Sequence, residues 1–292
     1  MNDYEYAIEI NGLTKKYDGF TLDNVSFNVP KGSIMGFIGQ NGAGKTTTIR
    51  ALLNITKCDA GSIKLLGLDH IQNEYKIKEH IAAVFDEIPF HEGFNAIQVG
   101  RMFRGLYSGW DEKKYSEYLD RFSLPRKKKI AKFSKGMKMK LQISAALSHG
   151  ARLLVMDEAT TGLDPVVRNE ILDIFREYLQ DKENSILMSS HITSDLDKIA
   201  DCVTFIDKGK ILLTGYKDDI LESHGILKCT KDDFKEIASE DYISARVTDF
   251  VVEAMVSDRA EAKQKYSGAL IEKTNLEEIM LFYVNREKKE WS

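Results

Sequence analysis

The residues from Gly39 to Thr47 have the types and spacing of a phosphate-binding loop, because they match G-x-x-x-x-G-K-[ST] at every fixed position. Glycines let backbone N–H groups turn toward an anion at the positive end of a helix. Lys45 adds a positive charge, and the Thr46 hydroxyl is a suitable ligand for Mg²⁺. A glycine-rich surface turn without a ligand is the alternative, which the matched flanks disfavour. The predicted nucleotide-binding residues here are Gly39, Asn41, Gly42, Ala43, Gly44, Lys45, Thr46 and Thr47.

Two carboxylates, Asp157 and Glu158, follow the apolar run at 153–156. A buried strand that ends in two acids places them at the carboxyl edge of a sheet. We expect Asp157 to hold Mg²⁺, directly or through water. Glu158 would then be free to accept a proton from an attacking water. Paired acids at a strand end are more often plain surface charge, but the preceding phosphate loop favours the catalytic interpretation.

Ser134 stands at the N-cap position of a helix predicted over 135–148. Lysines crowd this positive end of the helix, which the helix dipole disfavours. They are Lys132, Lys135, Lys138 and Lys140. An anion opposite the helix start would resolve the conflict; solvated lysines are the usual explanation of such a cluster, and both interpretations stay open.

The elements that must position these residues alternate between strand and helix. A strand is predicted over 33–38, directly before the phosphate loop, and a helix over 46–54, directly after it. Further strands are predicted at 63–66, 81–85, 153–156, 185–188, 203–206 and 211–214, and further helices at 166–179 and 194–200. A helical insertion at about 90–150 contains helices at 96–107, 112–122 and 135–148. The alternation predicts an α/β fold with a parallel sheet and short antiparallel pieces at its edge.

Residues 6–29 are predicted to form short antiparallel strands. The dipeptides Asn11-Gly12 and Asp18-Gly19 are both hairpin signals. Tyr17 lies in this part of the chain, before the phosphate loop, and an aromatic ring there could stack on adenine. A half-buried strand tyrosine explains Tyr17 equally well.

A domain boundary is predicted after Gly215, which gives a first domain over 1–215 and an accessory domain over 216–292. The second domain mixes candidate strands, at 226–229 and 245–256, with helices. Its last helix is amphipathic and begins with a capping-box spacing between Asn275 and Glu278. This helix needs a partner surface, either in its own domain or in a dimer or regulatory contact.

Composition narrows the class of protein. The chain has 292 residues, 43% of them apolar and 29% charged, and a net charge of −4, which does not suit a nucleic-acid binder. Its three cysteines, Cys58, Cys202 and Cys229, are far apart, which argues against disulfides and a metal cluster and favours a cytoplasmic setting. We expect no signal peptide in residues 1–10 and see no apolar run near the roughly 18 residues of a spanning helix. Action at a membrane would therefore need a partner that supplies the span.

The order of the motifs is more specific than any one of them. The phosphate loop, the insertion with its Ser-x-Gly helix start, Asp157-Glu158, the stretch 161–164 and Ser190-His191 together resemble the nucleotide-binding domain of ABC transporters over residues 6–215. The resemblance implies a P-loop NTPase fold with an antiparallel β-subdomain, a helical signature subdomain and, here, a small α+β extension. It also implies roles for individual residues: adenine stacking for Tyr17, contact with the γ-phosphate of the opposite subunit for Ser134 and Gly136, general base for Glu158, an interface acid for Asp164 and a γ-phosphate sensor for His191.

The chain departs from that family at three places. The signature expected as Leu-Ser-Gly-Gly-Gln is Phe133-Ser134-Lys135-Gly136-Met137, which keeps the serine and the second glycine. Asp86 stands where the family has the glutamine of its Q-loop. As an oxygen ligand Asp86 could approach Mg²⁺ or the lytic water, so it is predicted as a catalytic and metal-binding residue. Ala159 replaces the usual proline after the acidic pair.

The signature variant, the residues 164–168 and the closing helix resemble the bacitracin-type, ABC-2-like exporter ATPases of Gram-positive bacteria. The resemblance implies a cytoplasmic ATPase subunit that binds ATP and Mg²⁺, pairs with a second nucleotide-binding subunit and powers a separate transmembrane permease. Alternatives are a non-transport ABC ATPase and a weakly hydrolysing regulatory subunit. The insertion is too short for the coiled coil of a chromosome-organising ATPase, and a translation factor usually carries two heads where this chain has one.

Overall fold

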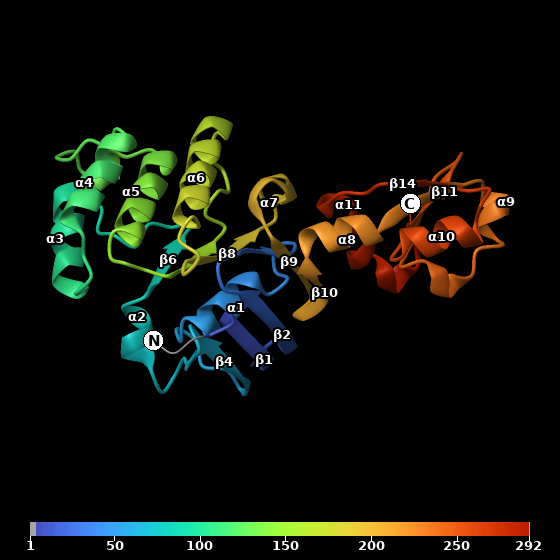
Figure 1. Cartoon of the computed structure of the whole chain (residues 1–292), viewed down its shortest axis with the longest axis horizontal. Coiled ribbons are helices and arrows are strands. Elements are labelled where there is room, and N and C mark those ends of the chain that lie inside the picture. Colours follow the sequence, from blue (N-terminus) through green and yellow to red (C-terminus); the bar gives the residue numbers. More distant parts are fainter. Residues whose placement is uncertain (1–3, 292) are drawn as a thin grey trace.

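The central sheet is built from strands whose carboxyl ends carry the predicted site. These strands are β3 (Ile34–Ile38), β6 (Ile81–Phe85), β7 (Leu153–Asp157), β8 (Ser185–Ser190), β9 (Cys202–Asp207) and β10 (Lys210–Tyr216). Their order in this computed structural model, which describes residues 4–291, is β10-β9-β3-β8-β7-β6 (Figure 1). All neighbours pair in parallel except β10 with β9. The predicted α/β fold, with a parallel sheet and an antiparallel edge piece, is confirmed.

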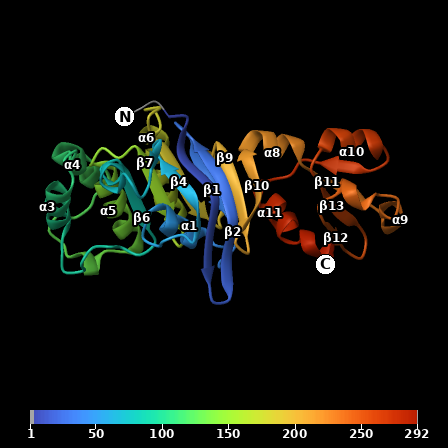
Figure 2. The ribbon, with the colours of Figure 1, turned by 90° about the horizontal axis from the view of Figure 1, so that it is seen from below.

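A second, antiparallel sheet packs below the first in the order β2-β1-β4-β5. Its strands are β1 (Tyr6–Tyr17), β2 (Phe20–Pro30), β4 (Ala60–Leu65) and β5 (Leu68–Asp69). Asp18-Gly19 forms the predicted hairpin turn between β1 and β2, which projects as a long ribbon (Figure 2). The prediction of a hairpin at Asn11-Gly12 was wrong. Gly12 lies inside β1 at a register shift with a φ of 64°, because a bulge uses the same left-handed conformation as a tight turn.

Helices cover the central sheet and extend it at one end. The helices α1 (Lys45–Leu52) and α2 (Glu74–Lys78) lie on the side of the antiparallel sheet. The helical subdomain lies beyond β6 and contains α3 (Ala96–Leu106), α4 (Glu112–Arg121), the 3-10 helix η1 (Ile130–Lys132) and α5 (Lys135–Leu147). The helices α6 (Pro165–Tyr178) and α7 (Thr193–Ile199) follow β7 and β8. Side chains of Asn95, Asp111 and Ser134 cap α3, α4 and α5, so local sequence fixes where these helices begin.

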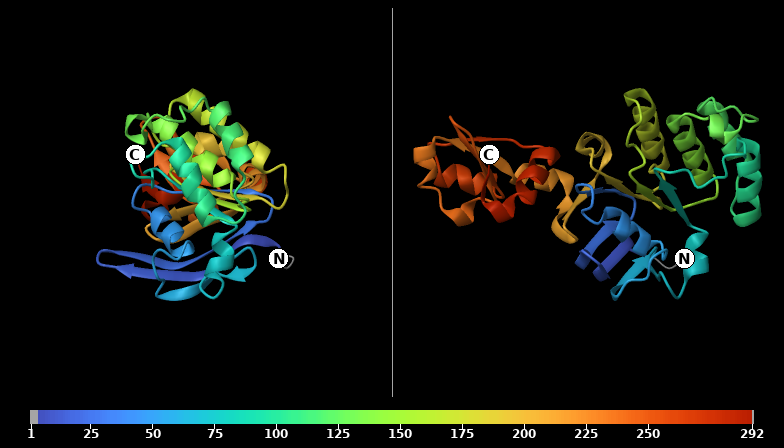
Figure 3. Two further views of the ribbon diagram at one scale, coloured as in Figure 1. Left: turned by 90° about the vertical axis from the view of Figure 1, so that its left-hand side faces the viewer. Right: turned by 180° about the vertical axis from the view of Figure 1, so that it is seen from behind.

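The C-terminal part of the chain lies at the opposite end from the helical subdomain (Figures 2 and 3). Its sheet has the order β14-β11-β13-β12-β15. The elements are α8 (Lys217–Ser223), β11 (Gly225–Cys229), α9 (Lys231–Phe234), η2 (Ser239–Asp241), β12 (Ala245–Val247), β13 (Val252–Val256), α10 (Arg259–Lys265), β14 (Leu270–Glu272), α11 (Leu276–Val284), η3 (Arg286–Lys288) and β15 (Glu290–Trp291). The candidate strand at 245–256 is thus two strands. The boundary predicted after Gly215 falls inside β10 and stays a prediction.

One face of the final α-helix, α11, is buried within this chain. Its Leu276, Ile279 and Phe282 belong to the same apolar cluster as Leu196 and Ile199 of α7. The C-terminal sheet is therefore attached to the helix that follows His191.

Residues 1–3, where part of the expectation about a signal peptide falls, lie outside the described residues. Among residues 4–291, the structure contains no helix with the length and apolar character that crossing a bilayer requires.

Candidate functional site

The phosphate loop connects β3 to α1 and needs glycine at two positions for different reasons. Gly44 has a φ of 118°, which side chains rarely allow, and a Cβ there would lie 2.7 Å from Leu22. A Cβ on Gly39 would lie 2.4 Å from the carbonyl oxygen of Ile206. The loop is therefore pressed against β2 and β9, which fixes its backbone before any anion arrives.

A cavity of about 400 Å³ opens above this loop. Its lining brings together residues of the phosphate loop, the start of α1 and the end of β7: Phe20, Gln40, Asn41, Gly42, Gly44, Lys45, Thr46, Thr47 and Glu158. Lys45 is only 5% exposed, and its Nζ donates to the carbonyl oxygens of Gly39 and Gln40 at 2.7 and 3.2 Å. Most of the predicted phosphate-loop residues thus line one cavity. The largely buried Lys45 side chain provides a positive charge in its wall.

Glu158 is held by three side chains from different motifs. Its Oε1 lies 3.0 Å from Nζ of Lys45, and its Oε2 lies 2.8 Å from both the Thr161 hydroxyl and Nδ1 of His191. Burial raises the pKa of Glu158, but these hydrogen bonds and the positive charge of Lys45 outweigh burial and bring the pKa below its ordinary value. Because an ionised carboxylate only accepts hydrogen bonds, Nδ1 of His191 carries the proton. Glu158 is therefore ionised and oriented, as a general base must be.

Asp157 and Thr46 offer oxygen atoms of the kind that bind Mg²⁺, and their role as its ligands stays a prediction. Asp157 is 7% exposed, and its Oδ1 accepts a hydrogen bond from the Ser189 hydroxyl at 2.7 Å. A carboxylate and a hydroxyl are oxygen ligands that Mg²⁺ prefers, and Mg²⁺ is usually bound by one or two carboxylates together with substrate phosphates. Residues 4–291 contain no cluster of three or more His, Cys, Asp or Glu side chains that could hold a metal without such a substrate.

Comparison with known proteins agrees with this geometry. Residues 22–161 match the family model described as ABC transporter. The bacitracin transport ATP-binding protein BcrA of Bacillus licheniformis is 35% identical over 211 residues, which are 70% of this chain and 68% of that protein. The chain belongs to the ABC transporter ATP-binding proteins.

Further relatives support the family and its fold. The daunorubicin/doxorubicin resistance ATP-binding protein DrrA of Streptomyces peucetius is 33% identical, over 75% of this chain and 68% of that protein. A solved structure of an ATP-binding subunit of an ABC transporter is 28% identical with a TM-score of 0.67, covering 73% of this chain and 91% of that chain. As a member of this family, the chain is an ATPase that binds and hydrolyses ATP.

The predicted signature lies at the start of α5, where the hydroxyl of Ser134 accepts a hydrogen bond from the backbone N–H of Met137 at 3.2 Å. Ser134 is exposed and Gly136 is half-buried against Val167 of α6. Asp164 caps α6 by accepting from the N–H groups of Val166 and Val167. The contacts of these residues with an opposite subunit stay predictions.

Three of the four lysines around the predicted signature have carboxylate partners inside the chain. Lys135 pairs with Asp86 at 2.5 Å, Lys138 with Glu92 at 3.7 Å and Lys140 with Glu170 at 2.6 Å. Carboxylates of the same chain thus supply negative charge near the lysines at the start of α5. Asp86 lines a separate cavity of about 430 Å³ with Lys135 and Lys138, and its predicted role as a metal ligand stays a prediction.

Several residues of the site were not identified from the sequence. Phe20 lines the cavity, whereas Tyr17 pairs across the hairpin with Phe20 and is 46% exposed. The adenine-stacking role of Tyr17 stays a prediction. Ser189 donates to Asp157 and accepts from the N–H of Glu158 at 3.1 Å. The available signal for Ser189 was a pair of hydroxyl residues, Ser189 and Ser190, directly after the apolar run at 186–188.

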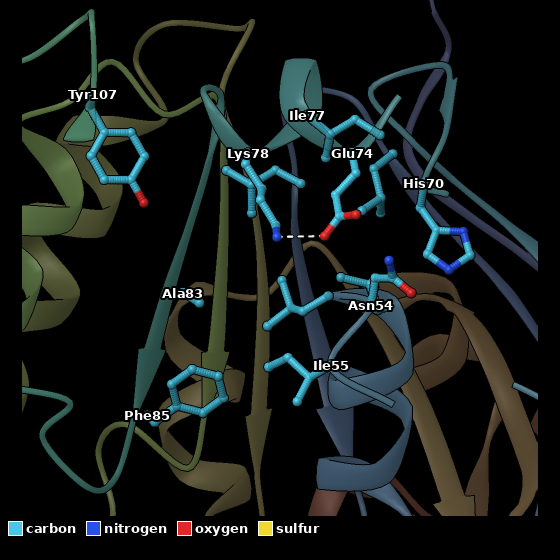
Figure 4. Close-up of a pocket in the computed structure, with 13 residues that line it drawn as sticks. Asn54, Ile55, His70, Glu74, Ile77, Lys78, Ala83, Phe85 and Tyr107 are labelled. Atoms are coloured by element: carbon cyan, nitrogen blue, oxygen red, sulfur yellow. Dashed lines mark hydrogen bonds and ion pairs between the residues drawn. The ribbon is translucent and has the colours of Figure 1, made fainter. Parts of the chain in front are cut away.

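An apolar groove lies on the other side of β6 (Figure 4). It has a volume of about 270 Å³ and is lined by α1, α2 and β6 together with Tyr107 from the end of α3. Ile55 at its edge is 61% exposed, and Phe85, the last residue of β6, forms part of its wall. Exposed apolar surface beside a structured groove is typical of protein contact sites.

Proposed function

We propose that the chain is the MgATP-hydrolysing subunit of an exporter and works at the cytoplasmic face of the membrane through a separate transmembrane permease. The observation that carries the proposal is the approach of Lys45 and Glu158 to 3.0 Å across one cavity. The ammonium group of Lys45, which could bind phosphates, thus lies beside the carboxylate of Glu158, which could accept a proton from water. Relatives named for bacitracin transport and for daunorubicin/doxorubicin resistance support export as the direction.

Lys45 and Glu158 separate in the proposed reaction. A triphosphate attracts Lys45 to its β- and γ-phosphates, and Glu158 exchanges the lysine for a water molecule. Glu158 accepts a proton from this water, the water oxygen bonds to the γ-phosphorus, and the bond to the bridging β–γ oxygen breaks, which leaves ADP and inorganic phosphate. Mg²⁺, when bound by Thr46 and Asp157, neutralises charge on the phosphates. His191 and Thr161 keep the carboxylate oriented.

Each site would be completed by a second subunit. We propose a head-to-tail homo- or heterodimer in which each ATP lies between Lys45 of one subunit and Ser134 and Gly136 of the other. The exposure of Ser134 among residues 4–291 supports this arrangement, because its side chain is accessible to a second subunit. Closure would require the γ-phosphate, so hydrolysis reopens the dimer.

The groove beside β6 is our proposed contact for the permease. An apolar permease segment seated against Ile55 and Phe85 would press on the strand whose next residue is Asp86. This contact would join transport to the ATP site. An Ile55→Asp variant should keep its basal ATP hydrolysis and lose stimulation by the permease.

The decisive experiment compares wild type with Glu158→Gln in the presence of MgATP. The variant should bind ATP and accumulate as a dimer in light scattering, whereas wild type hydrolyses ATP and returns to monomer. Glu170→Gln is the matched control, because Glu170 also pairs with a lysine, at 2.6 Å, but lies outside the cavity. Wild-type turnover by Glu158→Gln would refute the general-base role. Absence of hydrolysis by wild type, alone and with the co-purifying permease, would favour the regulatory alternative.

A further inference from the structure

Two residues on one side of α5 hold the end of β6. The side chain of Gln142 bonds both backbone groups of Phe85: Nε2 donates to the carbonyl oxygen at 3.0 Å, and Oε1 accepts from the N–H at 3.4 Å. Two turns earlier on the helix, Lys135 pairs with Asp86 at 2.5 Å. Because β6 is the edge strand of the central sheet, these contacts attach the helical subdomain to the sheet at two consecutive residues.

The two attachments differ in strength. Gln142 is 3% exposed and neutral, so its hydrogen bonds are shielded from water and salt. The side chains of Asp86 and Lys135 are each 44% exposed, so solvent and ions compete for this pair. Gln142 is therefore suited to a permanent anchor and the ion pair to an adjustable one.

Lys135 also reaches the loop after β7. A Cβ on Gly162 would lie 3.3 Å from Nζ of Lys135, so the ammonium group lies close to the backbone of this loop. The same loop contains Thr161, which holds Glu158. Lys135, the first residue of α5, thus contacts both the residue after β6 and the loop after β7. Its neighbour in the chain is Ser134.

We propose that Asp86 and Lys135 are a positioning pair that sets where the start of α5, with Ser134, lies relative to the carboxyl ends of β6 and β7. Asp86 acts through Lys135 and not through the metal. The consequence for Ser134 rests on the proposed function, whereas the effect on the arrangement of the subdomains does not.

The arrangement can be measured without hydrolysis. Spin labels at 113 in α4, where Lys113 is 88% exposed, and at 182, in the exposed turn before β8, report the distance between the helical subdomain and the sheet. The background carries Cys58→Ser and Cys229→Ser, because only Cys202 is buried. Asp86→Asn and Lys135→Gln should each broaden or shift the distance distribution. Asp86→Lys combined with Lys135→Asp should restore it, and Lys132→Gln, which removes the same charge nearby, should leave it unchanged.

Turnover gives the second readout. Each single variant should lower kcat by about tenfold with little change in KM for ATP, because displaced reacting groups cost rate more than binding. The half-saturating concentration of Mg²⁺ should stay the same. The charge exchange, that is Asp86→Lys combined with Lys135→Asp, should recover most of the wild-type kcat. Unchanged distances in both single variants would overturn the proposal. So would a shifted Mg²⁺ requirement in Asp86→Asn that the exchange does not rescue, because Asp86 would then be a metal ligand. If wild type fails to hydrolyse ATP, the proposed function fails, and the distances still decide on the pair.

Discussion

The strands β6 and β7 lie side by side in parallel, with Phe85 opposite Asp157, and each is followed by a carboxylate that pairs with a lysine. In the first pair, Glu158 and Lys45 are 18% and 5% exposed and line the cavity over the phosphate loop. In the second, Asp86 and Lys135 are each 44% exposed and line a neighbouring cavity. In our proposal, the carboxylate–lysine pair after β7 takes part in the chemistry, and the similar pair after β6 sets the position of the helical subdomain. Burial and the element that carries the lysine make the difference.

The largest expected effect is at the buried lysine. Lys45→Ala should lower kcat/KM for MgATP by at least about 10²-fold, because a preorganised charge on the transferred phosphate is lost. Lys135→Ala should lower it about tenfold or less. Steady-state kinetics and calorimetric ATP titration measure both. Equal losses in the two variants would remove the distinction between the two strand ends.

Ser189 should matter next, because it orients both acids at the end of β7. Ser189→Ala should lower kcat by about 10- to 100-fold, because Ser189 holds Asp157, our proposed Mg²⁺ ligand, and losing a residue that orients a metal ligand commonly has this effect. Ser185→Ala is the matched control, since it lies at the opposite end of β8 and accepts a hydrogen bond from the N–H of Gly32. The control should keep its kcat. A Ser189→Ala enzyme as fast as wild type would show that Asp157 and Glu158 need no support from β8.

The two ion pairs should respond differently to salt. Double-mutant cycles on unfolding free energy should give a coupling of about 0.5 kcal/mol for Asp86 and Lys135 that falls toward zero in high salt. The coupling for Lys45 and Glu158 should exceed about 1 kcal/mol and persist, because burial limits screening. Denaturant titrations of single and double variants at low and high salt measure both. Equal salt dependence would contradict the burial argument.

The last prediction concerns the pH dependence of stability. The pKa of Glu158 is lowered in the folded state, so its ion pair stabilises the protein at pH values above the unfolded pKa of about 4.3 and is lost as pH falls through the lower folded pKa. Without nucleotide or Mg²⁺, wild type should exceed Glu158→Gln in unfolding free energy by about 1–2 kcal/mol at pH 7, and by less below about pH 4. Denaturant unfolding across this range measures the difference. A gap that widens on acidification would contradict the direction of the shift.

Sequence rules that depend on a few neighbouring residues predicted much of the local structure around the ends of β6 and β7. The strand expected at 81–85 is β6, with the same bounds, and Ser134 is the N-cap that was expected. Caps, breakers and side-chain periodicity depend only on near neighbours, which is why they could be recognised. The phosphate loop could be recognised from the spacing of its own residues alone.

Contacts between distant segments could not be predicted in the same way. Gln142 and Phe85 are 57 residues apart, and only the register of the sheet edge brings them together. The placement of Phe20 in the cavity over the phosphate loop, with Tyr17 across the hairpin, depends on where β1 and β2 pair. A glutamine within the mainly apolar second half of α5, at 141–147, was the one available signal for the anchor at β6. The ion pair of Lys135 had a weaker signal, an excess of lysines without visible partners.

The central claim is that the carboxylates that follow β6 and β7 have separate roles. The most direct test is to measure single-turnover hydrolysis of MgATP, together with ATP affinity, for Glu158→Gln and Asp86→Asn. Glu158→Gln should bind ATP and lose about 10²- to 10⁴-fold in rate, the usual contribution of a general base. Asp86→Asn should bind ATP, lose about tenfold, and recover in the charge exchange with Lys135. A loss in Asp86→Asn as large as that in Glu158→Gln, without recovery, would contradict the account, because both carboxylates would then act directly in the chemistry.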